Sequence, residues 1–152
     1  MTLLLALLIG VIAGLRAMTA PAAISWAAHV GILGLEGSWL AFMGYAWTPW
    51  IFTVLAIGEL VTDQLPTTPS RTVPVQFGTR ILSGALCGAA IGITTGSLIA
   101  GTVAGAVGAV IGTLGGRAVR ARLAAAFGKD RPAALIEDVI AIGGALAIVA
   151  AL

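Results

Sequence analysis

Residues 98–114 read LIAGTVAGAVGAVIGTL, a run that contains no charged side chain. At about 1.5 Å of rise per residue, a helix of this length crosses most of a ~30 Å hydrocarbon core. Gly101 and Gly105 lie four residues apart on one face of that helix, and Gly108 and Gly112 repeat the spacing. Small residues at this spacing let helix backbones approach closely. The run therefore predicts a membrane-spanning helix that packs tightly against a neighbour.

The segment before it, residues 77–95, is also apolar apart from Arg80 and has glycines at the same spacing. Because the turn Thr95-Gly96-Ser97 between the two runs is short, we expect an antiparallel helical hairpin. Glycines at this spacing also suit contact between two copies of the chain. The faces we expect to serve the hairpin or a homo-oligomer are Gly84/Gly88/Gly92 and Gly101/Gly105.

The composition of the whole chain is also typical of a membrane protein. Of the 152 residues, 59% are hydrophobic and 9% are charged, against about 25% charged in an ordinary soluble domain. A net charge of +2 is too small to indicate a nucleic-acid partner. We predict an all-α protein, a polytopic transmembrane bundle of five or six helices arranged as hairpins, with 1–152 as a single integral membrane domain. The apolar segments are 2–15, 22–35, 40–61, 77–95, 98–114 and 133–152.

The first two apolar segments leave two arrangements open, because each is shorter than the others. Both segments could span the membrane and meet at a turn that contains Arg16, or one could span and the other re-enter. A five-span chain would hold Arg16 well inside the membrane, where an unpaired charge costs several kcal/mol. The six-segment arrangement avoids this cost and is the one we favour.

Basic residues predict the orientation. Lys and Arg concentrate on the cytoplasmic side of membrane proteins, so the segment 117–131, expected to be a loop, is placed in the cytoplasm. The connection that contains Arg71 then lies on the same side, and Glu36 is the only charged residue outside. The tryptophans form an aromatic belt at the outer boundary. The basic residues of 117–131 are Arg117, Arg120, Arg122, Lys129 and Arg131.

A weak internal similarity links the two ends of the chain. Residues 14–17 (GLRA), followed by Pro21-Ala22-Ala23, are echoed by 115–118 (GGRA), followed by Pro132-Ala133-Ala134. Both stretches predict a helix end, a connection and a helix start with proline in its first turn. An internal repeat and chance similarity in a sequence rich in alanine and glycine both explain the match.

Charged residues also fall inside the apolar segments, where they need partners or water. Glu59 and Asp63 share one helix face, and Arg80 lies near the start of the next helix. The last helix starts near Asp130, a good N-cap residue. An ion-pair network that locks the hairpins and a polar site that binds a cation, a proton or a lipid headgroup are both consistent with this pattern. The candidate site comprises Glu59, Asp63, Arg80, Glu137, Asp138 and Arg16.

Two functions follow from these two interpretations. The first is a small transporter or channel-like protein with a cytoplasmic-side site for a cation or proton. The second is a non-transporting membrane scaffold or lipid-binding protein whose buried charges are structural ion pairs. If the charges form a binding site, Arg16, Arg80 and Arg117 could instead hold a phosphate. No nucleophile–base pair or phosphate-cradling loop is visible, so we expect no enzyme and no cofactor. The spacing of the acids identifies no particular metal.

Short motifs resemble a family of small bacterial integral-membrane proteins catalogued only as a domain of unknown function. The similar residues are Gly58-Glu59-Leu60-Val61-Thr62-Asp63-Gln64-Leu65-Pro66 and Arg80-Ile81-Leu82-Ser83-Gly84-Ala85, together with Gly14-Leu15-Arg16-Ala17 before Pro21. Where the family more often has Asp-Lys, this chain has Asp63-Gln64. The resemblance implies a bacterial cytoplasmic membrane protein and emphasises Glu59, Asp63 and Arg80, but it implies no activity.

Overall fold

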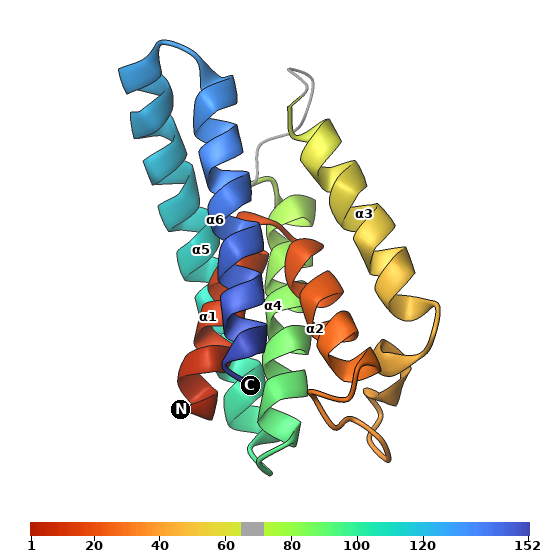
Figure 1. Cartoon of the computed structure of the whole chain (residues 1–152). Helices are drawn as coiled ribbons and strands as arrows, with labels where there is room; N and C mark the ends of the chain where they lie inside the picture. The colour runs from red at the N-terminus through yellow and green to blue at the C-terminus, as the bar shows by residue number, and fades with distance from the viewer. Residues whose placement is uncertain (65–71) are drawn as a thin grey trace.

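The computed structural model describes residues 1–64 and 72–152 of the chain. Within these residues the protein is all-α: six α-helices and a short 3-10 helix, with no strand. The helices run alternately up and down the bundle (Figure 1). They are α1 (Thr2–Leu15), α2 (Thr19–His29), η1 (Ala41–Gly44), α3 (Thr48–Thr62), α4 (Pro74–Ile93), α5 (Leu98–Phe127) and α6 (Asp130–Ala150).

Glycines hold α1, α4 and α5 in close contact. A Cβ built on Gly105 would lie 2.1 Å from the carbonyl oxygen of Gly84, and one built on Gly10 would lie 2.1 Å from that of Gly105. Likewise, a Cβ on Gly88 would lie 2.3 Å from the carbonyl oxygen of Gly101. Only hydrogen fits at these positions, so the glycine faces of α4 and α5 are occupied within the chain. They are not available for contact with a second copy.

Helix α5 is longer than its apolar run. The segment 117–131 was expected to be a loop, and this is wrong: α5 continues to Phe127, and only Gly128, with φ of +67°, turns the chain into α6. Residues 117–127 contain no glycine or proline and consist largely of Ala, Arg and Leu, which favour helix. The basic residues therefore lie mainly on a helical hairpin that extends past the other helices (Figure 1).

Several other boundaries differ from the expected ones. The expected segment 40–61 becomes η1 and a shorter α3, which begins with Pro49 in its first turn. The expected segment 22–35 becomes α2, which begins earlier and ends at His29. Residues 30–40 are mostly apolar but do not form an α-helix, because Gly31 and Gly37 adopt positive φ. Leu33 and Leu35 of this segment are nevertheless buried. Pro66, expected to end the third helix, lies outside the described residues.

Two helices, α5 and α6, are long and apolar enough to cross a membrane, while α1 and α3 are apolar but shorter. The α1–α2 turn, the end of α3, the start of α4 and the α5–α6 hairpin all lie towards one end of the bundle (Figure 1). Both termini and the α2–α3 connection lie towards the other end. There the rings of Trp26 and Trp50 meet edge to face, with centroids 5.1 Å apart.

The two similar stretches of sequence, 14–23 and 115–134, share structure only in their second parts, which contain the prolines. Pro21 is the third residue of α2 and Pro132 the third residue of α6, so the two helix starts correspond. The preceding halves do not, because α1 ends just before Arg16 whereas Arg117 lies inside α5.

The glycine contacts predict that Gly105→Ala lowers stability. Its new methyl group would overlap the backbone of Gly84, and overpacking of this kind costs about 1–3 kcal/mol. Thermal unfolding in detergent, followed by circular dichroism, measures the effect. Gly143→Ala is the matched control, because nothing lies within 4 Å of its added Cβ. Equal melting temperatures for the two variants would contradict the prediction.

Candidate polar site at a helix break

The break between α1 and α2 creates the site. Pro21 has no N–H, and in a continuous helix its ring would clash with the carbonyl of Ala17, one turn earlier. The chain instead leaves the helix at Arg16, which is extended with φ −140° and ψ 108°. The carbonyl of Ala17 accepts a hydrogen bond from the Ser83 hydroxyl. Proline thus forces the break, and α4 supplies a partner for the freed carbonyl.

Charged side chains complete the two helix ends at this break. Glu59 of α3 accepts hydrogen bonds from the backbone N–H groups of Ala17 and Met18, both 2.8 Å long. Arg80 of α4 donates to the carbonyls of Gly14 and Leu15 at 2.9 and 2.6 Å. A helix start carries partial positive charge and a helix end partial negative charge. The acid therefore caps the start of α2, and the base caps the end of α1.

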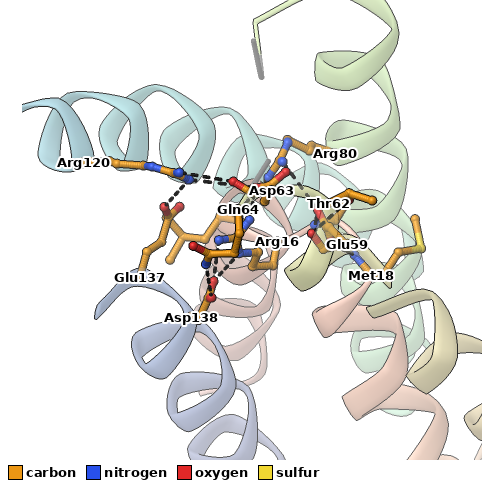
Figure 2. Close-up of polar contacts among 12 residues, drawn as sticks. Arg16, Met18, Glu59, Thr62, Asp63, Gln64, Arg80, Arg120, Glu137 and Asp138 are labelled. Atoms are coloured by element: carbon orange, nitrogen blue, oxygen red, sulfur yellow. Dashed lines mark hydrogen bonds and ion pairs between the residues drawn. The ribbon is translucent and has the colours of Figure 1, made fainter. Parts of the chain in front are cut away.

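Arg16 connects two helices that are distant in sequence. Its side chain is fully buried. Its guanidinium donates from Nε to Asp138 of α6 at 2.7 Å and also pairs with Asp63 at the end of α3. Gln64 donates to the other oxygen of Asp138 at 3.3 Å. Figure 2 shows the two carboxylates pointing towards Arg16 from opposite sides.

Arg120 of α5 forms the outer part of the network. Its guanidinium lies 3.6 Å from Glu137 and 4.0 Å from Asp63. Its two shortest hydrogen bonds, 2.6 and 2.9 Å long, go to the carboxylate of Asp130. Asp130 was expected to be an N-cap of the last helix. This is wrong, because Lys129 occupies that position and no side-chain capping bond forms. Asp130 instead pairs with Arg120 across the Gly128 turn.

All six residues singled out from the sequence meet in this network: Glu59, Asp63, Arg80, Glu137, Asp138 and Arg16 (Figure 2). The sequence interpretation missed Arg120 and Gln64. Arg120 was assigned to a loop, and the signal that could have identified it is the uninterrupted helical composition of 117–127. Arg117, which was grouped with Arg16 and Arg80, is exposed and donates to Thr72 instead.

Opposite charges meet among the described members of the network. Arg16, Arg80 and Arg120 pair with Glu59, Asp63, Glu137 and Asp138, and Arg120 also pairs with Asp130 at the hairpin. The side chains of Glu59, Asp63, Glu137 and Asp138 are mostly buried, with exposures of 7–14%, whereas Asp130 is exposed. Residues 1–64 and 72–152 contain no group of three or more His, Cys, Asp or Glu placed to hold a metal ion.

A groove borders this network. It has a volume of about 280 Å³, lies between α1, α5 and α6, and has Arg120 and Glu137 in its lining. Its remaining lining is apolar or glycine, including Leu15, Gly115 and Ile140. Two members of the network therefore border a groove that is otherwise apolar.

Comparison with protein-family models, curated proteins and solved structures found no match for this chain. The resemblance to a family of bacterial membrane proteins accordingly remains a prediction.

Arg16→Met should unfold more easily than the unchanged protein by about 3–5 kcal/mol, because it removes the guanidinium that two buried carboxylates share. Equilibrium unfolding in detergent measures this change. Adding Asp63→Asn and Asp138→Asn should restore part of the loss. The exposed Arg122→Met is the control and should stay within about 0.5 kcal/mol. A loss equal to that of the control would show that Arg16 contributes nothing.

Proposed function

We propose that this chain is a six-span bacterial cytoplasmic membrane protein, a small transporter or channel-like protein whose network at the break responds to a proton or a cation. The observation that carries the proposal is the position of Glu59, whose carboxylate holds the first backbone N–H groups after the helix break and also faces Arg80. A proton or a small cation that binds this carboxylate would compete with those contacts.

The outer surface supports the membrane placement. Helix α3 presents Ile51, Val54, Ile57 and Val61 to the outside, each more than half exposed. Large apolar side chains are exposed along α5 and α6 in the same way. A soluble protein rarely exposes apolar area on this scale, and lipid would cover it without cost. Helices α1 and α2 are short, but both pack inside the bundle and meet at a turn whose polar groups are paired.

The break itself supports a transport role. Discontinuous helices whose ends face a polar site recur in membrane transporters, because helix ends offer backbone groups to ions. Here those backbone groups are held by Glu59 and Arg80, which are themselves 3.5 Å apart. Protonating or displacing Glu59 would release the start of α2, so charge at this residue is coupled to the conformation of the break.

A non-transporting scaffold or lipid-binding protein is the second candidate. The direct contacts favour it, because Arg16 is already paired with Asp138 at 2.7 Å and Arg80 with two carbonyls. In that case the charges serve only to fix the helices, and the lipid bilayer is the partner. Homo-oligomers would use surfaces other than the glycine faces.

The orientation predicts where single cysteines can be labelled. In a Cys87→Ala background, Glu36→Cys should react with a membrane-impermeant maleimide on intact cells. Lys129→Cys should react only after the membrane is opened, because the α5–α6 hairpin faces the cytoplasm. Both positions are exposed. Labelling of both from the same side would exclude the six-span arrangement.

Flux measurements test the transport role. Purified protein in liposomes should conduct protons or one of Na⁺, K⁺ and Mg²⁺, read with a pH-sensitive dye and ion-selective electrodes. Gln64→Lys should lower the flux at least about tenfold, because an ammonium group beside Asp138 competes with a proton or cation for the acids without removing one of them. Glu59→Gln/Asp63→Asn should lose the flux as well.

Glu36→Gln is the matched control, since it removes an acid at the opposite end of the bundle, and its flux should be unchanged. The scaffold interpretation gains if the unchanged protein moves no ion across this panel while Glu59→Gln/Asp63→Asn lowers the yield of folded protein. Flux that Gln64→Lys leaves intact would contradict the role of these acids.

A further inference from the structure

A second cavity lies between α2, α3 and α6. Its volume is about 290 Å³. The lining includes Thr19 and Trp26 of α2, Ala56 and Leu60 of α3, and Ala145 and Leu146 of α6. No lining residue is charged, and most are apolar. The side chains of Ile57, Ile142 and Leu146 at its edge are exposed, so the cavity opens sideways between α3 and α6.

Thr19 places a buried, unpartnered hydroxyl in this cavity. The residue is only 7% exposed, and its Oγ1 has no hydrogen-bond partner among the described residues. Helical threonines usually donate to the carbonyl four residues earlier, as Thr53 does to Pro49 and Thr113 to Ala109. For Thr19 that carbonyl is Leu15, which lies across the break and accepts from Arg80. The break therefore removes the usual partner of Thr19.

The other polar groups of the cavity are already satisfied. The indole N–H of Trp26 donates to the Thr53 hydroxyl at 3.0 Å, and that hydroxyl donates onward to a carbonyl. A buried hydroxyl left without a partner costs free energy. Among the described lining residues, the cavity thus presents one open hydrogen-bonding group, the Thr19 hydroxyl, in a mostly apolar wall.

Size and charge restrict the occupant. A volume of about 290 Å³ is at the lower limit of ligand pockets, roughly 300–1,000 Å³. Buried waters need two to four polar partners each, and the wall does not offer them. An ion would enter without a counter-charge at a high desolvation cost. The occupant that fits is neutral, mainly apolar, and carries one hydrogen-bonding group.

We propose that this cavity binds a small neutral molecule with an apolar body and one hydroxyl group, which pairs with the Thr19 hydroxyl. The molecule enters sideways from the bilayer between α3 and α6. This site goes beyond the proposed ion response and does not depend on ion flux; it rests only on the membrane placement. A hydroxyl suits Thr19 because each of the two groups can either donate or accept.

Fluorescence quenching by a brominated probe tests the site. The probe is 4-bromobenzyl alcohol, and 4-bromotoluene is the comparison molecule that lacks the hydroxyl. The protein carries Trp39→Phe, Trp47→Phe and Trp50→Phe, so that Trp26, which lines the cavity, is the only reporter. We expect saturable quenching by the alcohol in detergent. The alcohol should bind more tightly than 4-bromotoluene.

Thr19→Val should weaken binding of the alcohol roughly 2- to 10-fold, the worth of one hydrogen bond, and leave 4-bromotoluene unchanged. Ala23→Leu, which fills the cavity, should abolish saturable quenching by both probes. Ser25→Ala is the control, because Ser25 also has a buried, unpartnered hydroxyl but does not line the cavity.

Folding is checked separately by thermal unfolding without probe, where Thr19→Val should melt no lower than the parent because it removes an unpaired buried polar atom. Quenching that rises linearly and equally in all variants would mean partition into detergent and would overturn the proposal. Equal affinity for both probes, unchanged by Thr19→Val, would overturn the role of the hydroxyl.

Discussion

Backbone hydrogen bonding at the α1–α2 break is the constraint on which the rest of the structure depends. A helix interrupted inside a bundle leaves carbonyls at one end and N–H groups at the other, and each must find a partner. Glu59, Arg80 and Ser83 meet this need from α3 and α4. Placing those side chains fixes the position of α3 and α4 relative to the break. Arg16, the residue at the break, then requires the acids of α3 and α6.

A buried network of ion pairs determines how the helices pack more than it raises the free energy of unfolding. Desolvating a buried ion pair can cost as much as the attraction returns, so the pairs need not raise the free energy of unfolding. They do exclude other arrangements, because any packing that separates Arg16 from Asp63 and Asp138 leaves buried charges unpaired. The glycine contacts of α1, α4 and α5 act differently, since they gain close van der Waals contact and hold one rigid core.

The sequence predicted the membership of the site better than the limits of the helices. Acids and arginines inside apolar segments must face one another, so Glu59, Asp138 and Arg80 could be grouped without a structure. Helix ends could not be found in the same way, because a helix can continue past the point where its residues stop being apolar, as α5 does. This is why Arg120 was missed on α5. Conversely, Leu33 and Leu35 are buried without being helical, since apolar character reports burial and not conformation.

The sequence distance between Arg16 and its partners has a consequence for how the chain is made. Asp63 follows Arg16 by 47 residues and Asp138 by 122 residues. At about 5–20 residues per second, roughly 6–24 s separate the synthesis of Arg16 from that of Asp138. In the proposed membrane arrangement, the first two helices therefore remain beside the insertion machinery, or at the membrane surface, during this time. Until Asp138 is made, the charge of Arg16 has only Asp63 as a partner from these two acids. The last helix completes the assembly, and a chain that stops before α6 would leave Arg16 without Asp138.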